Sequence, residues 1–221
     1  MLLEVHRIKS FEVNPWLLEK HYAKRIPSIS HAFGLYEGNV LIGVVTFGTP
    51  PSWTLCAGLC GKKYQGNVLE LNRLCLERNE KNEASFLVGR AMKMLPSKSI
   101  IVSFADTEQG HVGYVYQATN FVYTGLSSKF LDPKVKGLEH QHHATYANGL
   151  TNKQVEDKYG KENVYYEQRA RKHRYVFFTG TKREKKELRD SLKYKTLPFP
   201  KGESRTYDAS AKIDTQMILS L

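Results

Sequence analysis

The sequence predicts a mixed α/β fold in which helices flank a central sheet, and three stretches of chain support this. Two β-rich runs within residues 33–47 surround Glu37-Gly38-Asn39, which is a hairpin signal. Residues 68–76 alternate as a half-buried strand does, with Leu69, Leu71 and Arg73 expected on one face. Residues 84–95 have helical periodicity up to Pro96, and the apolar run 99–105 then predicts a central strand.

The remaining elements follow the same local rules. Residues 1–10 and 120–126 read as strands, and residues 127–149 as an irregular segment. Thr151 is a suitable N-cap and Gly160 a suitable stop for a small helix. The later expectations are a short helix, a strand, a charged helix and a stiff turn, at residues 111–119, 174–178, 182–192 and 197–201. We expect a catalytic domain over residues 1–150, a basic extension packed on it over 151–205, and a loosely held tail over 206–221.

Composition excludes several classes of protein. A chain of 221 residues can bury a sizeable core. No apolar run approaches the roughly 20 residues needed to cross a bilayer, and the N-terminus does not read as a signal peptide, so we expect no membrane partner. Cys56, Cys60 and Cys75 form no even framework and are interpreted as reduced thiols of a cytoplasmic protein.

The net charge of +11 is concentrated late in the chain. Residues 169–201 hold twelve Lys or Arg against three acidic residues, a balance of +9. Such segregation favours binding to the phosphates of nucleic acid over a merely solvated basic face or a tail that binds RNA without a role. The expected contacts are Lys24, Arg25, Arg169, Arg171, Lys172, Arg174, Lys182, Arg183, Lys185 and Lys186.

The densest group of polar side chains follows the predicted central strand, in residues 103–121. Asp106 ends that strand before a glycine and a helix start, which is where open α/β sheets place ligands. If the helix begins at His111, then Tyr114 and Gln117 lie near its side, whereas Tyr116 points elsewhere. The alternative is that Asp106 only caps the following helix.

Two further groups are candidates. His21 and Tyr22, followed by Lys24 and Arg25, would suit a lid over an anionic substrate, although a lone histidine is more often structural. On the strand at 68–76, Glu70 and Asn72, with Arg73 beside them, could bind the edge of an adenine, because an amide matches that base's donor and acceptor.

Metal binding is a weaker possibility. His21, Tyr22, Asp106 and Tyr116 would combine imidazole, phenolate and carboxylate, a set that suits iron better than zinc. His140, His142 and His143 form a second histidine-rich group, of the kind that is often only solvated.

Several motifs together resemble the Mom family of phage DNA-modification proteins, over about residues 15–201. The run Ala105–Phe121 is the specific part of this resemblance. The other matching pieces are His21-Tyr22 before Arg25-Ile26-Pro27, Leu69–Leu74, Ala84–Leu87, Lys172–Phe177 and Leu197–Lys201.

The resemblance implies an acetyltransferase-like fold, whose element order the predicted elements follow. It implies conversion of the exocyclic amine of adenine into an acetamido (carbamoylmethyl) derivative that shields phage DNA from restriction enzymes in the host cytoplasm. His21, Tyr22, Asp106 and Tyr116 would be catalytic, and iron and acetyl-CoA would be associated with the protein. Substrate would contact Glu70, Asn72, Arg73, Ser85, His111, Tyr114 and Gln117.

One departure concerns the donor. Acetyltransferases hold the CoA pyrophosphate on a glycine-rich turn before the central helix, but here that turn, residues 78–85, contains no glycine. A glycyl group on the adenine amine has the same atoms as the acetamido product, so an activated glycine such as glycyl-tRNA is a second expected donor. Two other functions stay open: N-acyl transfer to a small amine or to RNA, and a non-enzymatic antirestriction protein that only binds DNA.

Overall fold

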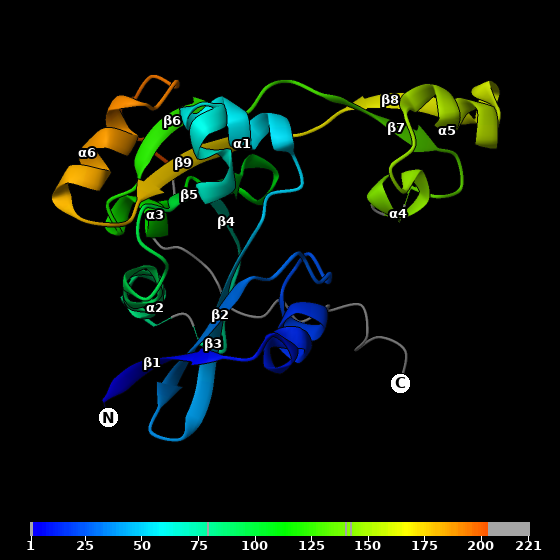
Figure 1. Cartoon of the computed structure of the whole chain (residues 1–221). Helices are drawn as coiled ribbons and strands as arrows, with labels where there is room; N and C mark the ends of the chain where they lie inside the picture. The colour runs from blue at the N-terminus through cyan, green and yellow to red at the C-terminus, as the bar shows by residue number, and fades with distance from the viewer. Residues whose placement is uncertain (1, 79, 140, 142, 203–221) are drawn as a thin grey trace, which may run out of the picture.

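A computed structural model describes residues 2–78, 80–139, 141 and 143–202. Its main sheet has seven strands in the order β1-β2-β3-β4-β5-β9-β6 (Figure 1). All neighbouring pairs are antiparallel except β4 and β5, which are parallel. The strands are β1 (Leu3–Ile8), β2 (His31–Glu37), β3 (Val40–Gly48), β4 (Val68–Leu76), β5 (Ile100–Asp106), β6 (Val122–Leu126) and β9 (Lys172–Phe178).

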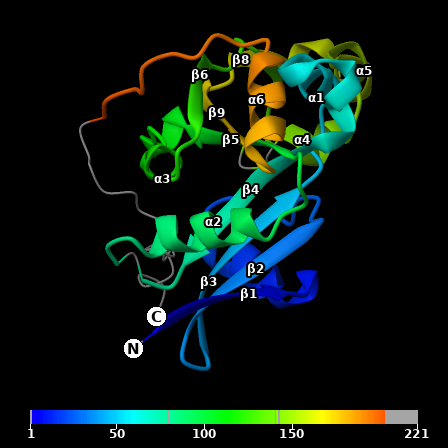
Figure 2. The same cartoon turned by 60° about the vertical axis from the view of Figure 1, so that its left-hand side comes forward.

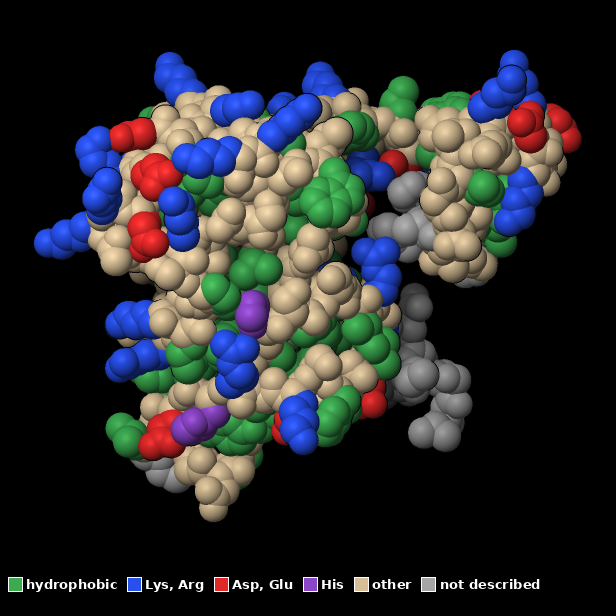
Figure 3. Space-filling model, in the orientation of Figure 1, with side chains coloured by type: hydrophobic (Ala, Val, Ile, Leu, Met, Phe, Trp, Pro, Cys, Tyr) green, Lys and Arg blue, Asp and Glu red, His purple; other side chains and the backbone are tan. Residues whose placement is uncertain are grey.

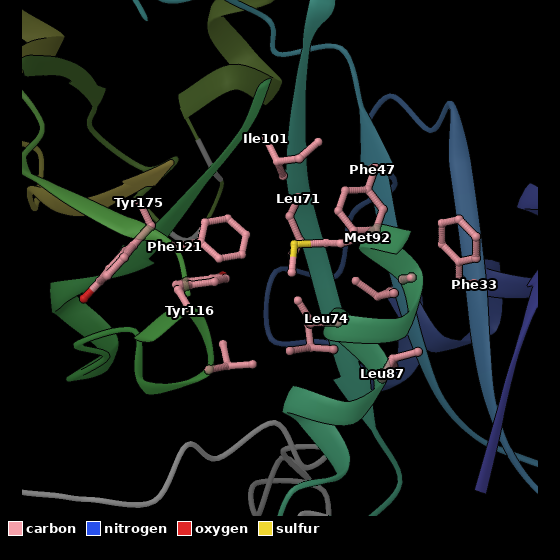
Figure 4. Packing of buried hydrophobic residues seen from close by; sticks show 14 of the residues in the cluster. Phe33, Phe47, Leu71, Leu74, Leu87, Met92, Ile101, Tyr116, Phe121 and Tyr175 are labelled. Atoms are coloured by element: carbon pink, nitrogen blue, oxygen red, sulfur yellow. The ribbon is translucent and has the colours of Figure 1, made fainter. Parts of the chain in front are cut away.

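Helices cover both faces of this sheet (Figure 2). On one face α2 (Glu83–Lys93) and α3 (Tyr114–Ala118) pack on the largest core cluster, which Figure 4 shows around Leu71, Leu74 and Phe121. On the other face lie α1 (Trp53–Cys60) and α6 (Lys182–Asp190). Alternation along β5 divides the two layers, since Ile101 belongs to the first cluster and Ile100 and Val102 to the second. The predicted mixed α/β fold is therefore confirmed.

The parallel pair in the middle of the sheet opens partway along its length. β4 and β5 pair only over Val68–Glu70 and Ile100–Val102, although both strands continue further. The Ser103 hydroxyl donates a hydrogen bond to the Leu71 carbonyl at 2.8 Å at the point where they part. Beyond it β4 continues beside β3, and a gap opens between the two parallel strands.

A second, two-stranded sheet stands away from the main body (Figure 1). It pairs β7 (Leu131–Val135) with β8 (Val164–Gln168), and α4 (His143–Ala147) and α5 (Asn152–Tyr159) pack beside it. Val135, Tyr146, Ala147 and Val155 form its small core. We call this unit, residues 128–171, the arm.

The arm corrects the prediction of an irregular segment at residues 127–149. β7 is short, contains Pro133 and pairs with a strand about thirty residues later, so local periodicity could not reveal it. The predicted helix over 111–119 begins only at Tyr114, because Gly113 adopts a φ of +79°. A Cβ at Gly113 would also lie 2.5 Å from the Tyr175 ring, so a glycine is required there.

Other predicted elements are found within one or two residues of their expected ends, including the Thr151 cap and the Gly160 stop of α5. α1 and β8 were not predicted. β9, from the expected basic extension, lies between β5 and β6, while the expected tail after residue 205 is outside the described residues. Short 3-10 or π turns occur at Ser10–Val13, Trp16–Lys20, Lys62–Asn67, Thr107–Gln109 and Lys161–Asn163. Within the described residues, no helix is long and apolar enough to span a membrane.

Candidate active site

A polar pocket of about 110 Å³ lies where β4 and β5 separate. Seven of the residues predicted for catalysis or substrate binding line it, although they come from four separate segments: His21, Tyr22, Glu70, Asn72, Arg73, His111 and Tyr116. Lys172, at the start of β9, completes the polar lining. This convergence makes the pocket the candidate active site.

A β-bulge in β4 shapes the pocket. Thr46 pairs with Arg73 and the next residue of β3, Phe47, pairs with Leu71, so Asn72 is the extra residue on β4. Leu71 and Leu74 consequently both enter the main core, and Glu70 and Arg73 fall on the opposite face. The expectation that Glu70 and Asn72 share one face while Arg73 lies on the other is therefore wrong, because strict alternation holds only without a bulge.

Glu70 and Arg73 supply opposite charges to the pocket. Burial raises the pKa of Glu70, while Arg73, Lys172 and Arg25 act in the other direction. Burial, and then Arg25, lowers the pKa of Arg73. Arg73 donates to the carbonyls of Asn72 and Arg25 at 2.6 and 3.3 Å, but its buried Nε has no hydrogen-bond partner among the described residues. A buried donor without a partner is costly, so this Nε is suited to a ligand oxygen.

His21 and Tyr22 form one wall and the mouth of the pocket. Their rings stack with centroids 4.4 Å apart, and the Tyr22 ring meets the His111 ring edge-on at 6.2 Å. The His21 Nδ1 accepts a hydrogen bond from the Ala23 amide, and burial, then Arg73 and His111, lowers the pKa of His21 to about 4. His21 is therefore neutral near pH 7. Tyr22 is 44% exposed, so its ring is open to a ligand.

Tyr116 reaches the pocket from the other face of the sheet. It is buried, and its ring lies 5.3 Å from that of Phe121 and 5.2 Å from that of Tyr175. Burial raises the pKa of Tyr116, against a hydrogen bond with Ser103. We expected Tyr114 and Gln117 to lie at the site and Tyr116 to point elsewhere. Instead Tyr116 lines the pocket, and Tyr114 and Gln117 do not. Those two side chains instead hold the segment at 200–202, since they donate to the carbonyls of Gly202 and Pro200.

Asp106 lies outside the pocket lining. One of its carboxylate oxygens accepts the Glu108 amide at 3.1 Å, and the other pairs with Lys172 at 2.8 Å. The capping role that the sequence left open is therefore what the structure shows. Asp106 also fixes Lys172, which itself faces the pocket. Lys172 had been expected only as a DNA contact, and no local signal joins it to Asp106, 66 positions earlier.

Two other predicted substrate contacts have their polar atoms bonded within the protein. The Asn72 amide accepts from Thr46 at 2.6 Å and donates to the Ser28 carbonyl at 2.8 Å, so it joins β3 to the loop before β2. Ser85 donates to the Asn82 carbonyl and lies in a separate hollow of about 730 Å³ between α2, the end of α3 and the β9–α6 turn.

The expected DNA contacts are spread over three regions. Lys24 and Arg25 are exposed beside the pocket, and Lys182, Arg183, Lys185 and Lys186 are exposed on α6. Arg169 and Arg171 lie at the root of the arm, where Arg169 pairs with Asp132 and Arg171 donates to the Ser127 carbonyl. Arg174 is buried, donates to Thr124 and lies 3.5 Å from the Tyr194 ring centroid, so we leave it out of the proposed surface.

Three of the four side chains expected to bind iron, His21, Tyr22 and Tyr116, line the pocket, whereas Asp106 lies outside its lining. The described residues contain no group of three or more His, Cys, Asp or Glu side chains placed to hold a metal ion. Asp106 is committed to Lys172 and Glu108, and the His21 Nδ1 to a backbone amide. His140, His142 and the side chain of His143 lie outside the described part of the chain.

The turn before α2 does not fit the pyrophosphate of CoA. Glu83, at the helix start, is buried, accepts the Glu80 amide at 3.1 Å and pairs with Arg78. Arg78 also pairs with Glu37 and Glu80. The Glu83 carboxylate thus accepts from a backbone amide that a bound phosphate would need, and Glu37 and Glu80 place two more negative charges nearby. Asn82 adopts a φ of +69° where a glycine would be the usual residue.

A mixed sheet that is covered by helices on both faces and opens between its two parallel strands onto a polar pocket makes this chain an α/β protein with its candidate site at the opening. The chain belongs to the Mom protein family, whose model matches residues 2–201. It is 28% identical over 215 residues to methylcarbamoylase Mom of Escherichia phage Mu, covering 90% of this chain and 84% of that one.

Solved structures similar to this chain include two N-acetyltransferases. The GNAT-family acetyltransferase of Bacillus cereus ATCC 10987 is 12% identical, with a TM-score of 0.43, and the match covers 82% of this chain and all of that one. The N-acetyltransferase of Staphylococcus aureus Mu50 is also 12% identical, with a TM-score of 0.44, and the match covers 80% of this chain and 99% of that one.

Proposed function

We propose that this chain converts the exocyclic amine of adenine in duplex DNA into an acetamido (carbamoylmethyl) derivative, and so protects phage DNA from restriction in the cytoplasm of the host. Membership of the Mom family and the name of the phage Mu relative support a group transfer of this kind. The observation that carries the proposal is that a half-buried carboxylate, Glu70, and the unpartnered Nε of Arg73 line the same pocket.

The adenine has to leave the base stack to reach this pocket, at a cost of about a few kcal/mol. Tyr22 is half exposed at the mouth and offers an aromatic face on which an extruded base would stack. Tyr116 closes the floor with a hydroxyl that burial keeps protonated. We assign these two tyrosines to orientation of the base.

Glu70 is the proposed general base, in place of Asp106. As a bond forms between the amine nitrogen and the carbonyl carbon of the donor, Glu70 takes the proton that the nitrogen loses. The Arg73 Nε–H would stabilise the negative charge that develops on the carbonyl oxygen. Lys172, held by Asp106, adds positive charge at the same pocket, which makes Asp106 a positioning residue.

Activated glycine suits the product better than acetyl-CoA. An acetyl group brings two carbons but no nitrogen, and the turn before α2 does not fit CoA. Transfer of a glycyl group from an ester such as glycyl-tRNA would form the N–C bond, break the ester C–O bond and return a proton to the released hydroxyl. The glycyl amide and the carbamoylmethyl product are isomers, so a rearrangement completes the sequence without an oxidant.

Nucleoside mass spectrometry on plasmid DNA from cells expressing the chain tests this function. We expect a shifted adenine peak with the wild type and its loss with Glu70→Gln, while Phe11→Ala, a substitution of an exposed residue outside the pocket, keeps it. Isotopic glycine supplied to the cells should label the product, and an unlabelled product would exclude glycine as the donor.

Two other functions would give different results. An acyltransferase acting on small amines or RNA would modify its substrate without DNA and with little salt dependence. A passive antirestriction protein would bind DNA and leave the mass of adenine unchanged. The charged pocket favours an enzyme over the passive protein, because burying Glu70 and Arg73 is costly for a chain that only binds DNA.

A further inference from the structure

Two adjacent apolar side chains are exposed at the root of the arm. Phe130 is 54% exposed and Leu131 is 59% exposed. Exposure of one large apolar residue is ordinary, but two neighbours beside a pocket and among cations form a feature that requires a reason.

The Phe130 ring is held in place rather than loose. The Phe130 carbonyl accepts the Arg169 amide at 2.9 Å, and the Arg169 guanidinium lies over the ring at 5.8 Å from its centroid. Asp132 pairs with the same guanidinium. Phe130 and Asp132 are two residues apart and both contact Arg169, so they share one face of the hairpin.

A short stretch of chain joins the residues that hold this ring to the candidate active site. Arg169 is three residues before Lys172, which lines the pocket and pairs with Asp106. Three residues span at most about 10 Å. The Arg171 guanidinium donates to the Ser127 carbonyl at 2.6 Å, which ties the root of the arm to the end of β6.

The surroundings are complementary to a phosphate backbone. Lys129, Arg169, Arg171 and Lys172 lie in the two segments that form the root, and Arg25 acts on the charges of Glu70 and Arg73 in the pocket. Figure 3 shows the arm standing off the body across an indentation, with Lys and Arg side chains at its edges. An exposed apolar side chain set among cations fits a nucleic acid duplex better than an apolar protein partner.

We propose that Phe130 is a wedge that enters the DNA duplex beside the target adenine and fills the space that the base leaves. Proteins that unstack duplex DNA insert Phe, Leu, Ile or Met side chains in this way. The proposal rests on the proposed function, and it assigns to the arm the task of opening the duplex for the pocket.

The test compares Phe130→Ala on two duplexes, one with the target adenine paired to thymine and one with it opposite an abasic site, where it has no pairing partner. We expect modification of the paired adenine to fall by roughly 30-fold or more, because the variant bears the cost of extruding the base without a wedge. Modification opposite the abasic site should stay within about 3-fold of the wild type, since an unpaired base costs less to extrude.

Tyr165→Ala is the matched control, because Tyr165 lies on the same face of the hairpin but at its far end, opposite Lys134. Tyr165→Ala should leave the rate of adenine modification unchanged on both duplexes. An equal loss on both duplexes with Phe130→Ala, or no loss on either, would overturn the wedge. If the wild type modifies neither duplex, the proposed function fails. In that case the fluorescence of 2-aminopurine at the target position tests the wedge by itself. A rise in fluorescence when the wild type binds, but not when Phe130→Ala binds, supports the wedge, and no rise with the wild type refutes it.

Discussion

At the scale of single residues, the extra residue Asn72 has the largest consequence for the site. It shifts the phase of β4, so that Glu70 and Arg73, three positions apart, face one pocket. The Asn72 side chain forms hydrogen bonds with Thr46 and with the Ser28 carbonyl, and these bonds hold the bulge in place. The bulge therefore brings Glu70 and Arg73 to one pocket. Asn72, which we had expected to bind adenine, instead stabilises the bulge.

Glu70→Gln should abolish modification without loss of stability. We expect a fall of about 100-fold or more in single-turnover rate, the usual contribution of a general base. Because burial raises the pKa of Glu70, the folded state stabilises the charged form less than water does, so removal of the charge should leave the urea midpoint equal or higher. The wild-type rate should also rise with pH as Glu70 ionises, at a higher pH than for an unshifted glutamate. A variant with full activity would remove Glu70 from the mechanism.

His21 should make stability depend on pH in the acid range. Its folded pKa is lowered to about 4, so between the unfolded value of 6.5 and about 4 the unfolded chain binds the proton that the native chain does not. Its contribution is complete above pH 6.5 and is lost as the pH falls, by at most about 3 kcal/mol. Urea unfolding at pH 7.5 and pH 5 should show a smaller difference for His21→Phe than for the wild type, and equal differences would contradict this assignment.

At the scale of elements, close backbone approach places the loop over the pocket. The loop at 21–28 carries His21, Tyr22 and Arg25, and its Ser28 carbonyl lies where a Cβ on Gly48 would be, 1.8 Å away. The Asn72 amide binds the same carbonyl. Glycine at position 48 is therefore needed for the loop to reach the mouth of the pocket.

Gly48→Ala should weaken both stability and modification. We expect a loss of about 1–3 kcal/mol, as for other overpacked sites, together with a lower rate, because the loop that positions Arg25 and Tyr22 must move. Gly66→Ala is the matched control, since a Cβ there would meet nothing within 4 Å. Denaturant midpoints and single-turnover rates for both variants would show the difference, and similar behaviour of the two would refute the argument.

At the scale of the whole molecule, the basic charge has three different uses. Some cations are exposed on α6, some tie the arm to the body, and Arg174 is buried under Tyr194. The total of +11 therefore overstates the surface that is available to phosphates.

Replacement of Lys182, Arg183 and Lys185 by Ala should weaken DNA binding and reduce its salt dependence. For every phosphate that the variant no longer neutralises, the slope of log K against log salt should become shallower by about 0.9. Lys9→Ala/Lys81→Ala, outside the basic segment, should leave the slope close to that of the wild type. The slope is obtained from DNA binding measured between 50 and 200 mM salt, a range over which about six phosphate contacts alter affinity strongly. An unchanged slope would remove α6 from the DNA-contacting surface.

Local patterns in the sequence determined the strands of the main sheet to within about two residues, the limits of β4, the Thr151 and Gly160 ends of α5 and the membership of a family. Periodicity and capping act within a few residues, so a single stretch of chain is enough to reveal them. Clusters of polar residues and the family resemblance also pointed to seven of the residues that line the pocket.

Only the tertiary structure decided how these residues work together. The bulge at Asn72 depends on pairing with β3, the Lys172–Asp106 pair joins strands 66 positions apart, and β7 exists only beside β8. Each depends on contacts between distant segments, whose energy no local pattern contains. The exchange of Glu70 for Asp106 as the proposed base, and the placement of Phe130 near the pocket, follow from those contacts.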